Sequence, residues 1–241
     1  MSLDKNSQEP LYVQLMRQIK DMIQNGHYKP GDQIPTEAEL GEIFKVSRIT
    51  VRRTIEELCA QGFLAKKQGK GTFVAEPKIY RKIELENNMS FSEACRSNGS
   101  KPSSHIVACH FMQAEAWQSE FLKLSDNKNI YHIERVLAAD ELPIIYEHIY
   151  IPVERVPDLQ VQNLENNSFT NLLYDRYKIR KSANGRSTIE VRVASQSIAE
   201  QLRLNIGDPV MIMKTYMNDY EEHPLYISHE IIAGSRYRIS I

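Results

Sequence analysis

The stretch Val46-Ser47-Arg48-Ile49-Thr50-Val51-Arg52-Arg53 decides the fold of the first third of this chain. Ser47 is a favourable N-cap, so a helix is predicted to begin at Arg48 and to end before Gly62. Just upstream, Thr36-Glu37-Ala38-Glu39 has the pattern of a capping box, which predicts a second, shorter helix. Two helices joined by a tight turn in this way are typical of a helix-turn-helix.

A short basic hairpin is predicted directly after these helices. Apolar segments at 63–65 and 72–74 flank Lys66-Lys67-Gln68-Gly69-Lys70-Gly71, and the glycines allow the backbone to approach a ligand closely. From residue 45 to 74 there are seven Lys or Arg against two Glu, although the formal net charge of the whole chain is −1. This order of elements predicts a winged helix-turn-helix that binds double-stranded DNA.

Each candidate DNA-binding residue has a physical reason. Arg48 and Arg52, one turn apart at the start of the second helix, suit bidentate contacts with guanine in the major groove. The hydroxyls of Ser47 and Thr50, beside the helix N-terminus, suit a phosphate. The other predicted DNA-binding residues are Arg53, Lys67, Gly69 and Lys70. A serine-capped basic helix alone is more often a solvated face, so the adjoining hairpin is what favours DNA binding.

Composition limits the remaining function classes. The 241 residues are 41% hydrophobic and 25% charged, which suits one small and one medium globular domain. We find neither an apolar run long enough to span a bilayer nor a signal peptide, so we expect a cytoplasmic protein without a membrane partner. Three cysteines without CxxC spacing predict neither a disulfide framework nor a zinc site, and we expect no cofactor.

The spacing of the seven histidines indicates whether any of them can bind a metal. His105 and His110 are five residues apart, and His223 and His229 are six apart. Neither spacing fits one face of a helix or a Cys/His site. We therefore expect surface or hydrogen-bonded histidines and no metal.

The N-terminal segments resemble the GntR superfamily of bacterial regulators. The matching segments are Pro10-Leu11-Tyr12, Gly31-Asp32-Gln33-Ile34-Pro35-Thr36-Glu37, Ser47-Arg48-Ile49-Thr50-Val51-Arg52 and Gly69-Lys70-Gly71-Thr72-Phe73-Val74. The resemblance implies base or phosphate contacts from Arg48 and Arg52, phosphate contacts from Ser47 and Thr50, and a minor-groove contact from Gly69. Ala38 stands where many relatives carry an arginine, so one base contact is absent or supplied elsewhere.

Beyond residue 79 the pattern alternates between strands and short helices. Strands are predicted at 130–138, 142–151, 187–194, 210–217 and 225–233, and helices at 90–98, 114–122, 169–177 and 195–204. This is the pattern of an α+β domain with a largely antiparallel sheet. We expect a DNA-binding domain at 8–75, a linker at 76–79 and a second domain at 80–241.

The second domain resembles the UTRA ligand-sensing domain of the HutC subfamily, which has a chorismate-lyase-like fold. Its best-matching pieces include Ile133-Glu134-Arg135-Val136, Leu142-Pro143-Ile144-Ile145-Tyr146-Glu147 and Leu204-Asn205-Ile206-Gly207-Asp208-Pro209-Val210. The resemblance implies an α+β protein, with an N-terminal winged helix-turn-helix joined to a C-terminal UTRA domain that binds an effector on an antiparallel sheet.

Amino-sugar-phosphate sensors of this type hold a phosphate with an Arg-x-Arg pair and small hydroxyl residues. Arg135 matches the first arginine, whereas Leu137 stands at the second position. The effector-binding residues implied by the match are Ser90, Ser92, Arg135, Glu147, Ser168 and Tyr226, the last in place of a family glutamate. Because one arginine is missing, we expect a small polar anion, favouring a carboxylate or a singly held phosphate over a doubly held sugar phosphate.

Simpler explanations exist for the same residues. Arg135 and Glu147 lie on neighbouring predicted strands and can form a cross-strand salt bridge. Ser90 and Ser168 each stand at a predicted helix start and can be N-caps alone. Tyr226 is more often a residue that packs on a sheet than one that stacks on a ligand.

The predicted function is effector-responsive transcriptional regulation, with repression favoured. A small DNA reader makes few base contacts, and two-fold dimers fit palindromic half-sites, so we expect a homodimer on a palindromic operator. One alternative is a lyase-like enzyme built on the second domain, although no nucleophile–base signature or phosphate loop supports it. The other is a ligand-independent DNA-binding protein, which a collapsed second domain would favour.

Overall fold

The computed structural model describes residues 3–4, 7, 9–75, 79–82, 89–125, 128–182 and 185–240. The chain forms two compact units, Met1–Pro77 and Lys78–Ile241. Most of the predicted linker, residues 76–78, lies outside the described residues. Ile79, which the sequence assigns to the linker, is instead the first residue of strand β3 (Ile79–Lys82), because it pairs with the last strand of the second unit.

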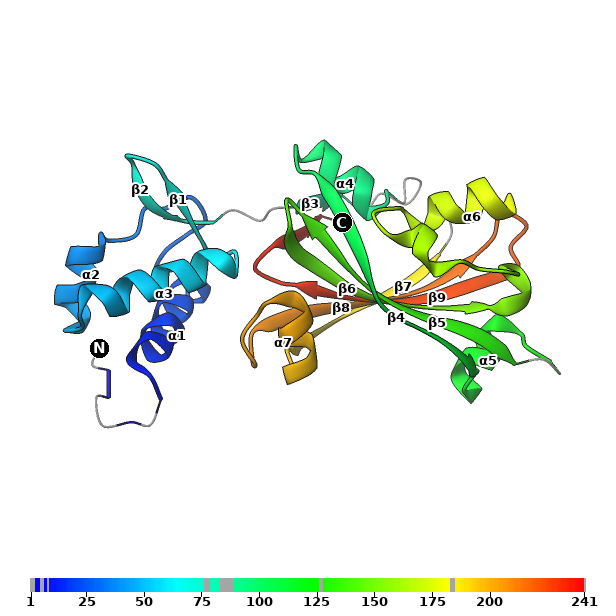
Figure 1. Ribbon diagram of the computed structural model, residues 1–241, viewed down its shortest axis with the longest axis horizontal. Helices are drawn as coiled ribbons and strands as arrows, with labels where there is room; N and C mark the ends of the chain where they lie inside the picture. The colour runs from blue at the N-terminus through cyan, green and yellow to red at the C-terminus, as the bar shows by residue number, and fades with distance from the viewer. Residues whose placement is uncertain are drawn as a thin grey trace. The chain divides into compact units, whose positions relative to one another are not determined.

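The described residues of the first unit form three helices and a two-stranded hairpin (Figure 1). Its elements are α1 (Leu11–Gln24), α2 (Glu37–Phe44), α3 (Arg48–Ala60), β1 (Leu64–Lys67) and β2 (Gly71–Val74). The strands pair antiparallel around a turn at residues 68–70. The predicted winged helix-turn-helix is confirmed.

Local capping sets the turn between α2 and α3. The Thr36 hydroxyl accepts the Glu39 N–H, and the Glu39 carboxylate accepts the Thr36 N–H at 2.8 Å, which completes the predicted capping box. Lys45 ends α2 in the left-handed region (φ 53°), and Ser47 starts α3 by accepting the Thr50 N–H at 3.2 Å. The angle between the two helices is therefore fixed by hydrogen bonds that the sequence already specifies.

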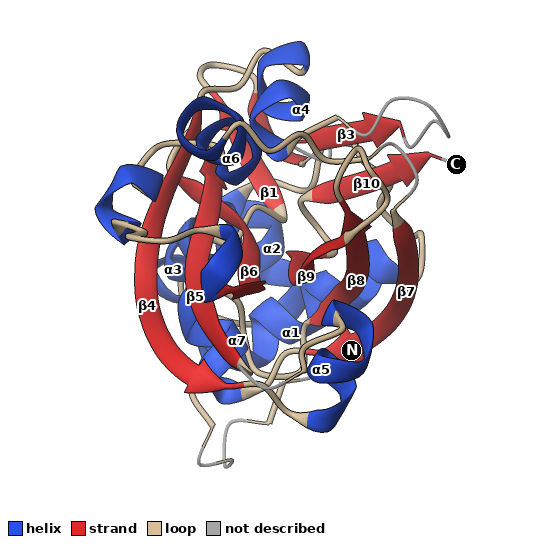
Figure 2. Ribbon diagram, turned by 90° about the vertical axis from the view of Figure 1, so that its right-hand side faces the viewer, coloured by secondary structure: helices blue, strands red, loops and turns tan. Residues whose placement is uncertain are grey.

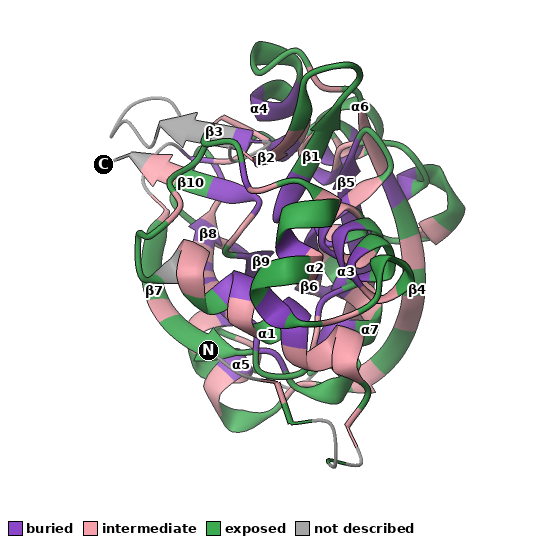
Figure 3. Ribbon diagram, turned by 90° about the vertical axis from the view of Figure 1, so that its left-hand side faces the viewer, coloured by how far each residue is buried: buried purple, intermediate pink, exposed green. Residues whose placement is uncertain are grey.

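The inner faces of the three helices form one apolar core. Figure 3 shows helices with buried inner and exposed outer faces. The buried apolar residues from α1 to α3 are Leu15, Met16, Ile19, Leu40, Phe44, Val51, Ile55 and Leu58. Burial of one face leaves the N-terminal outer face of α3 free to contact DNA.

A six-stranded antiparallel sheet with the order β4-β5-β6-β9-β8-β7 forms the second unit (Figure 2). Its strands are β4 (Pro102–Gln113), β5 (Asn129–Ala139), β6 (Leu142–Pro152), β7 (Arg186–Val193), β8 (Pro209–Asn218) and β9 (Pro224–Ala233). β3 pairs separately, in parallel, with β10 (Tyr237–Ser240). Five of the six strands were predicted. β4 was missed because only one residue of this edge strand is buried and the strand shows little apolar alternation.

Helices cover both faces of this sheet. α4 (Phe91–Ser97) and α6 (Phe169–Tyr177) lie on one face, and α5 (Ala116–Leu122) and α7 (Gln196–Leu202) lie on the other (Figure 1). Two 3-10 turns, η1 (Val153–Arg155) and η2 (Val161–Leu164), complete the unit. In the described part of the chain, no helix is both long and apolar enough to cross a membrane.

Side-chain alternation assigns the residues of the central strands to these two faces. Ile133 on β5 and Ile149 on β6 pack in a cluster with α6, whereas Val136 and Tyr146 pack in a cluster with α7. Odd-numbered residues from 133 to 137 and from 145 to 151 therefore face α4 and α6. The intervening even-numbered residues face α5 and α7.

Candidate functional site

The predicted base-reading residues lie on the outer face of α3. Arg48 and Arg52 are exposed, and Arg52 Nε is 3.4 Å from a carboxylate oxygen of Glu37 on α2. Ile49 stands beside Arg48 with 82% of its surface exposed. A large apolar side chain that contributes so little to the core is suited to contact with a thymine methyl group, a role that the sequence analysis did not assign.

Three other predicted DNA-binding residues also have structural roles. The hydroxyls of Ser47 and Thr50 are 2.9 Å apart within the α3 cap, so their phosphate contacts would extend an existing hydrogen-bond network. The Arg53 guanidinium stacks over the Tyr12 ring of α1 at 3.8 Å. Arg53 therefore joins α3 to α1, whether or not it contacts DNA.

The hairpin brings the remaining three residues to its turn. Gly69 (φ 71°) lies in open space, and Lys70 is exposed beside it. The Lys67 ammonium lies over the Phe73 ring at 4.5 Å. The side-chain amide of Gln33 donates to the Lys70 carbonyl at 3.0 Å, which fixes the hairpin against the loop before α2.

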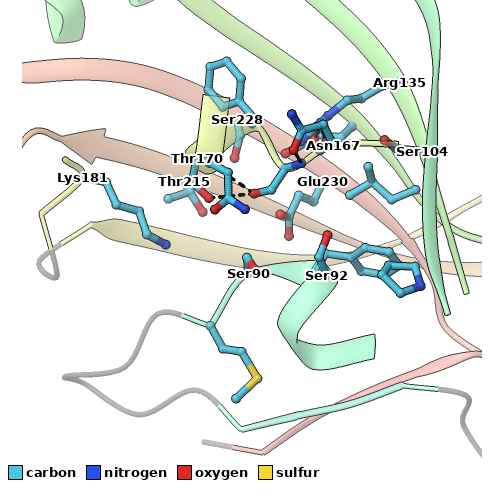
Figure 4. Close-up of a pocket in the computed structure, with 18 of the residues that line it drawn as sticks. Ser90, Ser92, Ser104, Arg135, Asn167, Thr170, Lys181, Thr215, Ser228 and Glu230 are labelled. Carbon is cyan, nitrogen blue, oxygen red and sulfur yellow. Dashed lines mark hydrogen bonds and ion pairs between the residues drawn. The ribbon is translucent and has the colours of Figure 1, made fainter. Parts of the chain in front are cut away.

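A cavity of about 470 Å³ lies on the α4 and α6 side of the sheet (Figure 4). All six predicted effector-binding residues line it: Ser90, Ser92, Arg135, Glu147, Ser168 and Tyr226. In Figure 4 Ser90 and Ser92 lie across the cavity from Arg135. Residues separated by up to 136 positions in sequence are thus gathered at one site large enough for a small metabolite.

Arg135 and Glu147 form the expected cross-strand salt bridge at the base of this cavity. They are directly paired in the β5–β6 register, and Arg135 Nε donates to Glu147 Oε2 at 2.6 Å. Arg135 Nη1 donates to the Asn167 carbonyl at 3.1 Å. Both side chains are buried, yet both line the cavity, so the ion pair and a ligand contact are compatible.

Ser90 and Ser168 are helix N-caps, as the simpler explanation predicted. Ser90 forms a capping box with Glu93, and its N–H and hydroxyl hold the pKa of the Glu93 carboxyl below its usual range. The Ser168 hydroxyl accepts the Asn171 N–H at 3.5 Å and lies 2.9 Å from the Thr170 hydroxyl. Because both caps line the cavity, the N-terminal ends of α4 and α6 lie at the cavity, where their dipoles favour an anion.

The last two predicted residues differ in what surrounds them. Ser92 lies in the first turn of α4 and lines the cavity. Tyr226 on β9 is buried, packs edge-to-face with Phe169 at 5.2 Å between ring centroids, and also lines the cavity. Tyr226 therefore shapes the cavity wall while it packs on the sheet.

Much of the polar lining was not predicted from the sequence. Lys181 and Arg96 add positive charge, and Glu230 adds a carboxylate, as Figure 4 shows for Lys181 and Glu230. One signal was available: Tyr226, Ser228 and Glu230 alternate along β9 and so share a face. Lys181 comes from the segment before β7, and no local pattern in the sequence pointed to it.

The two surfaces define a class of protein: a DNA-binding domain joined to a domain with a pocket of metabolite size. Comparison with known proteins agrees with this class. The chain belongs to the bacterial regulatory proteins of the GntR family, whose family model matches residues 11–74, and a UTRA domain matches residues 97–238. It is therefore a DNA-binding transcriptional regulator of the GntR and UTRA type, as the resemblance to HutC regulators predicted.

Individual relatives support the family over the whole chain. The chain is 31% identical over 239 residues to the HTH-type transcriptional regulator YurK of Bacillus subtilis, covering 99% of this chain and 98% of YurK. It is 29% identical over 241 residues to the HTH-type transcriptional repressor NagR of the same organism, covering 98% and 96%. The crystal structure of PhnF from Mycobacterium smegmatis has the same fold, with a TM-score of 0.63, 21% identity and coverage of 94% and 98%.

Proposed function

We propose that the protein is a repressor whose affinity for its operator is controlled by a small polar anion bound in the cavity of the second unit. The observation that carries this proposal is the cavity itself, which gathers cationic and hydroxyl side chains from α4, α6 and the sheet. The name of NagR as a repressor supports the direction of regulation. Because the target is chromosomal DNA, we place the protein in the cytoplasm.

The electrostatics of the cavity favour an anion that also carries hydroxyl or amine groups. Arg135, Arg96 and Lys181 supply positive charge, and two helix N-terminal ends add partial positive charge. Arg96 and Lys181 thus supply further cations, although Leu137 stands where the resemblance implies a second arginine. Glu147 and Glu230 can accept hydrogen bonds from hydroxyl or amine groups of the same ligand.

The alternatives are less well supported. A ligand-independent DNA-binding protein has no need of an open polar cavity of about 470 Å³. A lyase-like enzyme needs a group placed to transfer protons, and Glu147, one of the two carboxylates among the described lining residues, is held in an ion pair with Arg135 at 2.6 Å. Both observations favour a binding site that senses a metabolite.

Calorimetry tests the effector site. Thermal-shift screening of sugar phosphates, amino acids and organic acids first identifies the effector, because a ligand of the native state raises its melting temperature. We expect Arg135→Ala and Glu147→Gln to weaken its binding at least tenfold, and the parent complex to change operator affinity. Undiminished binding in both variants would place the site elsewhere, and binding that leaves operator affinity unchanged would refute the regulatory link.

Mobility-shift titration tests the DNA surface. We expect Arg48→Ala and Arg52→Ala each to weaken operator binding by roughly 1–3 kcal/mol where the contact is to a base. Lys70→Ala should weaken binding evenly across sequences and flatten the salt dependence. Arg176→Ala removes an exposed arginine of α6 and serves as the control. Parental affinity in both α3 variants would refute the assignment.

We further propose that the protein forms a homodimer through its second unit. This homodimer binds a palindromic operator. β7 is an edge strand of the sheet, and Val191 and Val193 on it are 75% and 66% exposed. An exposed apolar edge strand is a common site of strand or sheet association. Light scattering at micromolar concentration should show a dimer, and a purely monomeric protein would contradict the proposal.

A further inference from the structure

The sheet face opposite the cavity carries a polar cluster that the effector site does not use. His132 and Glu134 on β5 and His148 on β6 form this histidine–glutamate cluster. It lies between two apolar clusters, one packed with α7 and the other with α5. The spacing rules applied to the sequence did not find it, because strand pairing rather than sequence separation brings β5 and β6 together.

The ligand atoms of the cluster have nearly the spacing of a metal site. One donor atom from each residue lies within 4.8 Å of the other two. His132 Nε2 and His148 Nδ1 are 3.0 Å apart, and His132 Nδ1 is 3.8 Å from Glu134 Oε1. Zinc binds nitrogen and carboxylate oxygen at about 2.0–2.2 Å, so donors on one ion lie roughly 3–3.5 Å apart. The two imidazoles meet this spacing through His132 Nε2 and His148 Nδ1. Glu134 lies beside the other ring nitrogen of His132, so the carboxylate must move, or the His132 ring must turn, before all three donors reach one ion.

The two imidazoles already face each other. His132 Nε2 and His148 Nδ1 share one hydrogen bond. An ion would take the place of its proton, since neutral imidazole is the form that binds metals.

Neighbouring side chains hold the donors in position. The Tyr146 hydroxyl donates a hydrogen bond to the Glu134 carboxylate. The Tyr150 ring stacks on His132 with centroids 4.5 Å apart and planes 12° from parallel. His110 on β4 reaches the same carboxylate, with Nε2 at 3.9 Å from Glu134 Oε1 and 59% of its side chain exposed. Such supporting contacts orient ligands before an ion binds.

We propose that His132, Glu134 and His148 bind a divalent transition-metal ion such as Zn²⁺, with His110 as a fourth ligand. Two imidazoles and one carboxylate suit borderline ions of this kind better than Mg²⁺ or Ca²⁺, which prefer oxygen ligands alone. The site does not depend on the proposed effector. It does lie directly behind the effector cavity, because Glu134 and His148 are the chain neighbours of Arg135 and Glu147.

Calorimetric titration of the metal-free full-length chain with ZnCl₂ tests the site. We expect one ion per chain in the parent, no comparable binding of MgCl₂, and at least tenfold weaker zinc binding in His148→Gln and Glu134→Gln. His223→Gln is the matched control, because it removes an exposed histidine that lies beside the carboxylates of Asp219 and Glu221. A parental affinity in His148→Gln, or a loss only in the control, would overturn the proposal.

A second measurement does not depend on any variant folding. X-ray absorption of the zinc-loaded parent should show at least two imidazole ligands. A zinc spectrum without imidazole scattering would overturn the proposal. So would a parent chain that takes up no stoichiometric zinc.

Discussion

Removal of the Glu147 carboxylate should strongly destabilise the second unit, because it leaves a buried guanidinium without its counter-ion. Arg135 and Glu147 are only 4% and 7% exposed, and Arg135 Nε lies 2.6 Å from Glu147 Oε2. Two unit charges about 4 Å apart interact by roughly 4 kcal/mol at an effective dielectric constant near 20. Loss of one partner of a buried pair costs about 3–5 kcal/mol. Since Arg135 keeps its bond to the Asn167 carbonyl, we expect Glu147→Ala to cost about 3 kcal/mol.

Urea unfolding followed by tryptophan fluorescence measures this loss of stability in the second unit of the chain. The chain has one tryptophan, Trp117, and it lies in α5 of the second unit. Its signal therefore reports the unfolding of that unit separately from the DNA-binding domain, which need not unfold in the same transition.

A double variant provides the decisive control. Arg135→Met with Glu147→Leu replaces both charges by apolar side chains of similar volume. Such replacements of buried ion pairs are often neutral or stabilising, so we expect a stability within about 1 kcal/mol of the parent. A loss below about 1 kcal/mol in Glu147→Ala, or a double variant as unstable as the single one, would refute the reasoning. A stable double variant that no longer binds the effector would separate binding from stability.

Three further predictions concern other parts of the chain. Gly71 has φ 121°, and a Cβ there would lie 2.5 Å from the Gln33 side-chain nitrogen. Gly71→Ala should therefore lower the free energy of unfolding by about 1–2 kcal/mol, more than Gly69→Ala does, in a melting experiment followed by circular dichroism. Ile49→Gln should leave stability within about 0.5 kcal/mol of the parent yet weaken operator binding; equal affinity in a mobility-shift titration would remove Ile49 from the interface. Burial lowers the pKa of His229 to about 4. Between the ordinary histidine pKa near 6.5 and about 4, the unfolded chain therefore binds more protons than the folded chain. The free energy of unfolding should fall as the pH falls through this window. Urea titrations at pH 7 and pH 5 should show the loss in the parent and a smaller one in His229→Gln.

The DNA-binding domain could be predicted from sequence because its determinants are local. Caps at Thr36 and Ser47 and the left-handed residue Lys45 set the helix ends through hydrogen bonds within a few positions. Helical spacing then selects the buried face, and the exposed arginines follow from it. What the sequence did not show is that Arg53 stacks on Tyr12, a contact between α3 and α1 that depends on how the helices pack.

The cavity was predicted only where a resemblance supplied residue positions. Ser90, Arg135 and Ser168 line it as that resemblance implied, and their caps and ion pair were predicted as the simpler explanation. Only the structure shows that each residue has both roles. Lys181 was missed because it reaches the cavity from the segment before β7, whose pattern gives no sign of the sheet it approaches.

By itself, the sequence determined a winged helix-turn-helix, five strands and four helices of an α+β domain, and a family whose members bind DNA. These features follow from caps, turns and periodicity, which act over a few residues. Tertiary structure alone decided the strand order β4-β5-β6-β9-β8-β7 and the register that sets Arg135 opposite Glu147. The same register places His132 and Glu134 beside His148 on the opposite face. Strand pairing over long sequence distances has no local signature, and a shift of one residue would exchange the two faces of the sheet.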